Sequence, residues 1–255
     1  MTLSAAEFYD RLAPLFDVMT NWEERLAYEG PWLRAQLAAH EARSVLDAAC
    51  GTGGHALAFA EWGLETVGAD ASPAMIELAH QKGGSARFEV AALGAIAPTL
   101  NRQFDAAVCL GNSLPHLVAD AELGAGLRDL HACLRPGGLL VTHNLNYDSR
   151  WKKRPRFFGV QSGTLEGQQR LVWRFADYHD ETRTLTFHTA LFTEGDSGWS
   201  VEVNSTPQRP LFRDTLAAAL EEAGFRIEGA YGNMTGEPFD PDASPDLVVA
   251  AVTAA

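Results

Sequence analysis

A glycine-rich turn and an acid roughly twenty residues after it are the residues of this sequence best suited to bind a ligand. Residues 45–54 read VLDAACGTGG, an apolar run that ends in closely spaced glycines. Because glycine lacks a Cβ, the backbone at Gly51 and Gly53 can turn tightly and approach a ligand closely. Asp70 ends the next apolar run, where a carboxylate can accept hydrogen bonds from both hydroxyls of a ribose. The pattern predicts a site for an adenosine-containing cofactor.

Two cofactors fit this turn. Residues 51–56 read GTGGHA and match the permissive G-x-G-x-x-A pattern, so a nicotinamide-dependent oxidoreductase is one alternative. Asp47 favours S-adenosylmethionine instead, because an acid there can attract a sulfonium and an α-amino group but gains nothing beside a pyrophosphate. The long helical segment before the first strand points the same way, since many dinucleotide-binding folds begin with that strand. A purely structural turn is disfavoured, because strand, glycines and distal acid occur together.

The elements that must position these residues alternate between strand and helix, as in a parallel sheet with helices on both faces. We predict strands over 44–49, 65–69, 86–90, 104–110 and 139–145, and helices over 54–62, 73–81 and 120–134. Ser72 is a good N-cap, and Pro73 suits the first helical position. The turn at 135–138 is expected to end the last of these helices. Residues 4–40 are predicted to be helical, with a break at Pro31.

The pattern changes between about residues 156 and 207, where polar and apolar residues alternate. The runs 170–175, 184–188 and 199–203, with turns at 180–182 and 194–198, predict an antiparallel meander. A helix over 212–223 and strands over 225–230 and 247–252 follow. We expect one domain, residues 1–255, made of a helical cap (1–42), a cofactor-binding core (43–150), the meander as a lid or platform (155–207), and a C-terminal helix and strands (208–255).

Composition narrows the class of partner. A formal net charge of −13 argues against DNA or RNA, whose phosphates require a basic face. The dense basic run at 150–156 is interpreted as a solvated loop, with an anion-binding loop as the alternative. No apolar run reaches the roughly 20 residues of a membrane span, and no signal peptide is visible. Three dispersed cysteines indicate free thiols and no metal site. We expect a cytoplasmic protein with a small-molecule partner, and a homo-oligomer is possible.

Three segments carry a resemblance to a known family. Residues 45–53, together with Asp70, Ala71 and Ser72, resemble the cofactor motifs of class I S-adenosylmethionine-dependent methyltransferases. Residues 104–117 (FDAAVCLGNSLPHL), and 134–141 followed by Asn-Tyr-Asp, are similar to glycine and sarcosine N-methyltransferases. The resemblance covers residues 43–150. It implies an α/β, Rossmann-like fold with a seven-stranded, mostly parallel sheet whose last strand is antiparallel, plus the N-terminal helices and the inserted meander.

The resemblance also implies which residues hold S-adenosylmethionine, whose product is S-adenosylhomocysteine. The methionine part would lie on Asp47, Gly51 and Gly53, the ribose on Asp70, and Tyr9 would close over the cofactor. The full predicted set is Tyr9, Asp47, Ala49, Gly51, Gly53, Asp70, Ala71, Leu93, Leu110 and His116.

Three residues are candidates for contact with the methyl acceptor. Asn146 and Tyr147 end the fifth strand, where such folds place ligands, and His116 follows the fourth strand at the mouth of the crevice. The resembled glycine methylases carry an arginine directly before the Asn-Tyr-Asp triplet, where this sequence has Leu145. Leucine cannot pair with a carboxylate, so glycine is not expected as acceptor unless Arg174 or another residue replaces that contact. The sequence predicts transfer to a small-molecule amine, with an oxygen acceptor as the alternative.

Overall fold

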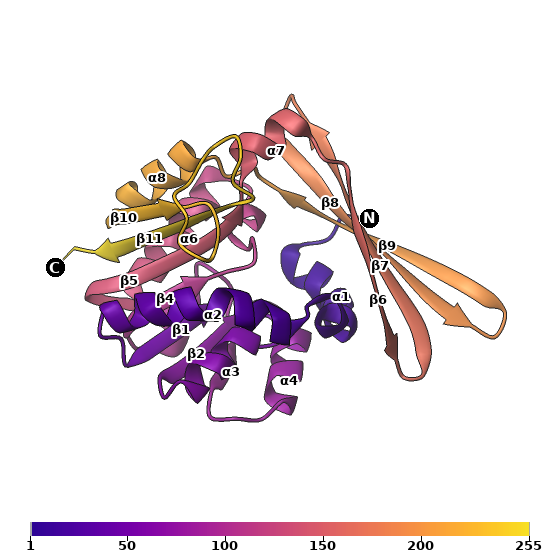
Figure 1. Cartoon of the computed structure of the whole chain (residues 1–255), viewed down its shortest axis with the longest axis horizontal. Coiled ribbons are helices and arrows are strands. Elements are labelled where there is room, and N and C mark those ends of the chain that lie inside the picture. The colour runs from indigo at the N-terminus through magenta and orange to yellow at the C-terminus, as the bar shows by residue number, and fades with distance from the viewer. Residues whose placement is uncertain (1, 255) are drawn as a thin grey trace.

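The computed structural model describes residues 2–254 and contains two sheets (Figure 1). A seven-stranded sheet has the order β10-β11-β5-β4-β1-β2-β3, and a four-stranded sheet, drawn at the right of the view, has the order β6-β7-β8-β9. Neighbours β3, β2, β1, β4 and β5 are parallel, whereas β11 runs antiparallel to both β5 and β10. The predicted fold class, including the antiparallel last strand, is confirmed.

The large sheet consists of β1 (Ser44–Ala48), β2 (Glu65–Asp70), β3 (Arg87–Val90), β4 (Phe104–Cys109), β5 (Leu134–Leu145), β10 (Phe225–Tyr231) and β11 (Asp246–Thr253). The helices are α1 (Ala5–Met19), α2 (Trp22–Ala39), α3 (Gly54–Glu61), α4 (Pro73–Gln81), α5 (Ile96–Leu100), η1 (Leu114–His116), α6 (Asp120–Ala132), α7 (Tyr147–Lys153) and α8 (Arg213–Glu222). None of the helices described is both long and apolar enough to cross a membrane.

Two hydrophobic cores cover the two faces of the large sheet. Val45 belongs to the core with Leu33 of α2 and Phe59 of α3. Its neighbour Leu46 belongs to the opposite core with Leu127 of α6. Successive residues of a strand point to opposite faces, so every residue of β1 is buried. A strand covered on both faces can reach a ligand only at its end, which is where the glycine-rich turn lies.

Helix α1 joins the two sheets. Phe8 and Leu12 pack with Val172 and Leu191 of the four-stranded sheet. On its other side, the Asp10 carboxylate accepts hydrogen bonds from the Ser72 hydroxyl at 2.5 Å and from the backbone N–H of residue 74 at 3.1 Å. In Figure 1, α1 lies between α4 and the small sheet. The N-terminal segment therefore positions the meander relative to the cofactor-binding core.

The small sheet is longer than its three predicted runs. It consists of β6 (Phe157–Leu165), β7 (Gln168–His179), β8 (Thr184–Gly195) and β9 (Gly198–Gln208). The rings of Phe157 and Trp173 stack on each other with centroids 5.3 Å apart, and Phe157 is exposed. Phe158 has the opposite orientation and faces inward.

Three local predictions are corrected. Pro31 lies inside α2 and does not break it, because Pro31 and residue 27, whose carbonyl loses its helical partner, are both exposed to water. The break is at Asn21, whose side chain caps α2. Residues 135–138 form an irregularity within β5, with Gly137 at φ +76°, and not a turn before it. Much of the basic run 150–156 belongs to helix α7, not to a loop.

Asp129 anchors the loop between β3 and α5, which borders the candidate site. Its carboxylate accepts hydrogen bonds of 2.8–2.9 Å from the backbone N–H groups of Gly94, Ile96 and Ala97. We predict that Asp129→Ala lowers the free energy of unfolding by about 3 kcal/mol, because three N–H donors lose a charged acceptor. Urea denaturation tests this. Asp214→Ala, at an exposed site on α8, is the control and should change stability by less than about 0.5 kcal/mol.

Candidate active site

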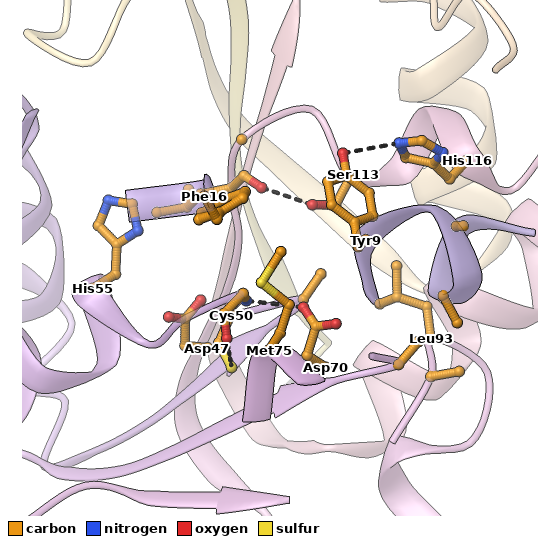
Figure 2. A pocket seen from close by; sticks show the side chains of 18 of the residues that line it. Tyr9, Phe16, Asp47, Cys50, His55, Asp70, Met75, Leu93, Ser113 and His116 are labelled. Carbon is orange, nitrogen blue, oxygen red and sulfur yellow. Dashed lines mark hydrogen bonds between the residues drawn. The ribbon is translucent and has the colours of Figure 1, made fainter. Parts of the chain in front are cut away.

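A cavity of about 200 Å³ opens at the carboxyl ends of β1, β2 and β4 (Figure 2). Nine of the ten predicted cofactor residues line it; Gly53 does not. The complete lining is Ala5, Ala6, Tyr9, Phe16, Trp22, Arg25, Asp47, Ala49, Cys50, Gly51, His55, Asp70, Ala71, Met75, Ala91, Ala92, Leu93, Leu110, Gly111, Ser113, His116 and Leu117. The turn, the acid after β2 and the segment after β4 therefore meet in one place.

Glycine is needed at two positions of the turn for different reasons. Gly51 has φ +54° and lines the cavity beneath the Phe16 ring, which a Cβ would meet at 3.4 Å. Gly53 has φ +78° and starts α3, and a Cβ there would lie 2.6 Å from the Phe88 ring. Gly51 thus leaves room beside the cavity, whereas Gly53 allows the helix to pack against the sheet.

Asp47 is a buried carboxylate whose Oδ2 has no hydrogen-bond partner among residues 2–254. Burial raises its pKa to about 7, against the opposing positive charge of Arg25. Such a group is costly unless a ligand supplies a cation or a donor. The geometry therefore fits the positively charged end of a ligand in this cavity.

Asp70 is held differently. The backbone N–H of Gly51 donates to Oδ2 at 2.8 Å, and that of Ser72 donates to Oδ1 at 2.9 Å. Burial raises the pKa of Asp70, while these two bonds act in the opposite direction. Each carboxylate oxygen retains a free lone pair that can accept a ligand hydroxyl. This is the arrangement expected for a pair of ribose hydroxyls.

His116 lies at the other end of the cavity, beside Tyr9. Its Nε2 is 3.2 Å from the Tyr9 hydroxyl and accepts a hydrogen bond from the Gln208 amide at 3.0 Å. Because Nε2 is an acceptor, the proton of the neutral ring is on Nδ1, which has no partner in the described chain. Burial lowers the pKa of His116 to about 4. The ring is therefore neutral near pH 7 and a weak base.

A second cavity, of about 440 Å³, adjoins the first and shares Tyr9, Phe16, Arg25 and Gly111 with it. The small sheet forms its outer wall. The remaining lining residues are Leu12, Met19, Thr20, Glu29, Asn112, His143, Leu145, Tyr147, Arg150, Phe158, Arg174, Ala176, Tyr178, Leu185, Phe187 and Gln208. The two cavities meet at Tyr9, so ligands bound in each could approach one another there.

The three predicted acceptor residues are not all brought together. Tyr147 lines the second cavity and His116 the first, but Asn146 lines neither. The Asn146 amide donates to the backbone carbonyl of Ser244 at 2.9 Å, and its oxygen accepts from the N–H of Ser149 at 3.2 Å. Asn146 therefore caps α7 and anchors it to the loop before β11, which is a structural role.

Sequence reasoning missed the contribution of α2. Arg25 lines both cavities, and its Nε donates to Glu29 at 3.0 Å. Glu29 also lies 2.6 Å from His55 Nε2. The bond to His55 and the charge of Arg25 outweigh burial and lower the pKa of Glu29 to about 2. No motif surrounds Arg25 in the sequence, so only the packing of α2 reveals its place.

Comparison with known proteins assigns this architecture. Residues 45–138 match the family model described as a methyltransferase domain. The chain contains an S-adenosylmethionine-dependent methyltransferase domain. The matched segment includes the glycine-rich turn, Asp70 and the β4 segment. Most of the residues that line the first cavity therefore belong to the matched segment. The predicted family is confirmed, and the nicotinamide alternative is not supported.

Two curated relatives that this chain matches are named N-methyltransferases. Over 148 residues the chain is 35% identical to a glycine/sarcosine/dimethylglycine N-methyltransferase of Actinopolyspora halophila, covering 56% of this chain but only 26% of that protein. Over 253 residues it is 26% identical to a glycine/sarcosine N-methyltransferase of Aphanothece halophytica, covering 92% of this chain and 87% of the relative. The predicted likeness to this group is confirmed.

Solved structures share the fold around the domain. A methyltransferase from Clostridium acetobutylicum superposes with a TM-score of 0.79 at 13% identity, covering 97% of this chain and 99% of the other. A sugar N-methyltransferase from Streptoalloteichus superposes with a TM-score of 0.75 at 24% identity, covering 90% and 88%. These likenesses extend over the small sheet as well, so the inserted meander is part of a known arrangement.

The unpaired carboxylate of Asp47 predicts pH-dependent binding of S-adenosylmethionine. Below pH about 7 the carboxyl is protonated and must lose its proton when a cationic ligand binds. The affinity should therefore fall by up to about tenfold for each pH unit below 7. Titration calorimetry between pH 5.5 and 8 tests this. Asp47→Asn should bind weakly and with little pH dependence; wild-type behaviour of this variant would contradict the assignment.

The same group predicts an inverse effect on stability. A folded-state pKa raised above the unfolded value means that stability is lost as the pH rises toward and through about 7. Asp47→Asn should therefore unfold at a higher denaturant concentration than the ligand-free wild type at pH 8, by roughly 1–3 kcal/mol, with a smaller difference at pH 5. If the wild type and Asp47→Asn had equal free energies of unfolding at both pH values, the burial of Asp47 would not destabilise the fold.

Proposed function

We propose that this protein transfers the methyl group of S-adenosylmethionine to the nitrogen of a small-molecule amine. The observation that supports this most directly is that the two cavities meet at Tyr9. Asp47 and Asp70 line the first cavity, and the second cavity is larger. The cofactor supplies an activated methyl group. The protein's task is then to align donor and acceptor and to exclude water.

Each part of the cofactor has a chemically suitable residue in the first cavity. Asp47 would accept the α-ammonium group, and the Arg25 guanidinium would pair with the carboxylate of the methionine part. Asp70 would accept the ribose hydroxyls. Leu93 and Met75 line the same cavity and offer apolar surface that suits the adenine ring. These roles agree with those that the resemblance implies, with Arg25 added.

The ionisable groups near the junction favour an amine over a hydroxyl acceptor. A hydroxyl requires a general base, whereas an amine can lose its proton to solvent before it binds. Burial lowers the pKa of His116 to about 4 and raises that of Tyr147 to about 12. Burial raises the pKa of Tyr9 as well. None of the three is matched to proton abstraction at neutral pH. The two curated relatives described above are both named N-methyltransferases, which supports the same choice.

Two measurements test the proposed function. Titration with S-adenosylmethionine, S-adenosylhomocysteine and NADH should show micromolar binding of the first two only. Release of S-adenosylhomocysteine should then be measured over a panel of primary and secondary amines, with hydroxyl compounds as comparison. Turnover of hydroxyl compounds alone would overturn transfer to nitrogen, and the absence of cofactor binding would overturn the whole proposal.

We further predict the pH profile of the reaction. At saturating cofactor, the acceptor's own deprotonation should govern kcat/KM, so the rate should rise with pH and level off near the pKa of the amine. Two acceptors with different pKa values should give correspondingly shifted profiles. His116 should add no inflection between pH 6 and 8, because its pKa lies near 4. An inflection at the same pH for both amines would identify a base on the protein.

A further inference from the structure

The second cavity contains two arginines without acidic partners. Arg174 of β7 and Arg150 of α7 both line it, and within the described chain neither lies within 4.0 Å of a carboxylate. Nearby basic residues differ: Lys152, Arg154 and Arg156 all pair with aspartates. Acidic residues outnumber basic ones in this chain, which has a net charge of −13. Two arginines without an acidic partner in one cavity therefore distinguish that cavity.

The Arg174 guanidinium is partly withdrawn from water. Its Nε is buried and has no hydrogen-bond partner among residues 2–254, and its side chain is only partly exposed. Desolvation lowers its pKa, and no carboxylate opposes that effect. A guanidinium in this environment loses hydration without gaining a counter-ion, which is unfavourable. A ligand with an acidic group would supply the missing partner in bidentate geometry.

The position of Arg174 relates it to the junction of the cavities. Arg174, Ala176 and Tyr178 alternate along β7 and line the same cavity. Arg174 is also close enough to Tyr9 for the two groups to affect each other's pKa. Leu145, which lies in the same cavity, offers no charge. Arg25 lines the cavity as well but is paired with Glu29, which leaves Arg174 as the unpaired arginine that the small sheet contributes.

The other walls of this cavity are largely apolar. Phe158, Leu185 and Phe187 line it together with the aromatic ring of Tyr178. Its volume of about 440 Å³ lies within the range of about 300–1,000 Å³ found for sites that bind drug-sized ligands. An acceptor as small as glycine would leave most of this apolar surface without contact. The walls suit an acceptor that carries an apolar or aromatic portion.

We propose that the methyl acceptor is an amine that also bears a carboxylate and an apolar side chain, and that Arg174 binds the carboxylate. This rests on the proposed function, because it assigns the second cavity to the acceptor. Arg174 is a specificity residue: it selects the acid and leaves the nitrogen facing the junction at Tyr9. Arg150, at 5.0 Å from the Phe158 ring, adds positive potential to the same cavity.

The test compares acids with their amides. L-phenylalanine and L-leucine are each titrated against their carboxamides on protein loaded with S-adenosylhomocysteine. Each acid should bind at least tenfold more tightly than its amide, as expected for one charge-assisted pair. Arg174→Gln should weaken the acids at least tenfold and leave the amides unchanged, and Arg174→Lys should recover part of the loss. Arg170→Gln, on the same face of β7 but outside the cavity, is the matched control and should change neither.

The outcomes separate this inference from the proposed function. If acids and amides bind alike, or if Arg174→Gln weakens both equally, the role of Arg174 is overturned. If acids bind through Arg174 but release no S-adenosylhomocysteine in assays with S-adenosylmethionine, the acid site stands and amine methylation fails. If S-adenosylhomocysteine itself does not bind, the cofactor assignment fails. The acid and amide titrations on the unloaded protein then decide the role of Arg174.

Discussion

The buried carboxylate of Asp47 is the constraint on which the rest of the site depends. It lies on β1, a strand covered by helices on both faces, and its Oδ2 has no partner in the described chain. A carboxylate in such a place is tolerated when the surrounding elements create a site for a cation. The positive charge of Arg25 from α2 opposes the effect of burial on the pKa of Asp47. The turn after β1 leaves the space beside the carboxylate open. The first cavity can be understood as the environment that this one charge requires.

Helix α1 extends this constraint to the second cavity. Its Tyr9 and Phe16 line both cavities, its apolar face packs on the small sheet, and its Asp10 is tied to α4. A second tie joins Asp17 to the Lys82 ammonium at 2.8 Å. Helix α1 therefore packs as one unit with the walls of both the first and the second cavity.

The sequence predicted the core well because the signals there are local. A strand, a glycine turn and an acid after the next strand are contiguous patterns, and Ser72 and Pro73 mark a helix start by their own chemistry. Arg25 could not be found in this way, since its role comes from the packing of α2 over β1.

The two faces of the meander were also ambiguous. Phe157 and Phe158 are adjacent aromatics. Phe158 faces inward because it packs against the cluster of Tyr147, Ala176 and Leu185, whereas Phe157 is exposed. Asn146 was predicted to contact the acceptor, and in the structure its side chain caps α7, because the end of a strand serves capping as readily as ligand binding.

The division of charge between the cavities bears on the direction of the proposed reaction. Transfer of a methyl group from a sulfonium to an amine moves a positive charge from the cofactor to the acceptor. The acids Asp47 and Asp70 favour the charge on the cofactor side, whereas Arg174 and Arg150 disfavour a cation beyond the junction. An acceptor with its own carboxylate would remove this repulsion. The carboxylate would neutralise Arg174 before methyl transfer places a positive charge on the acceptor nitrogen.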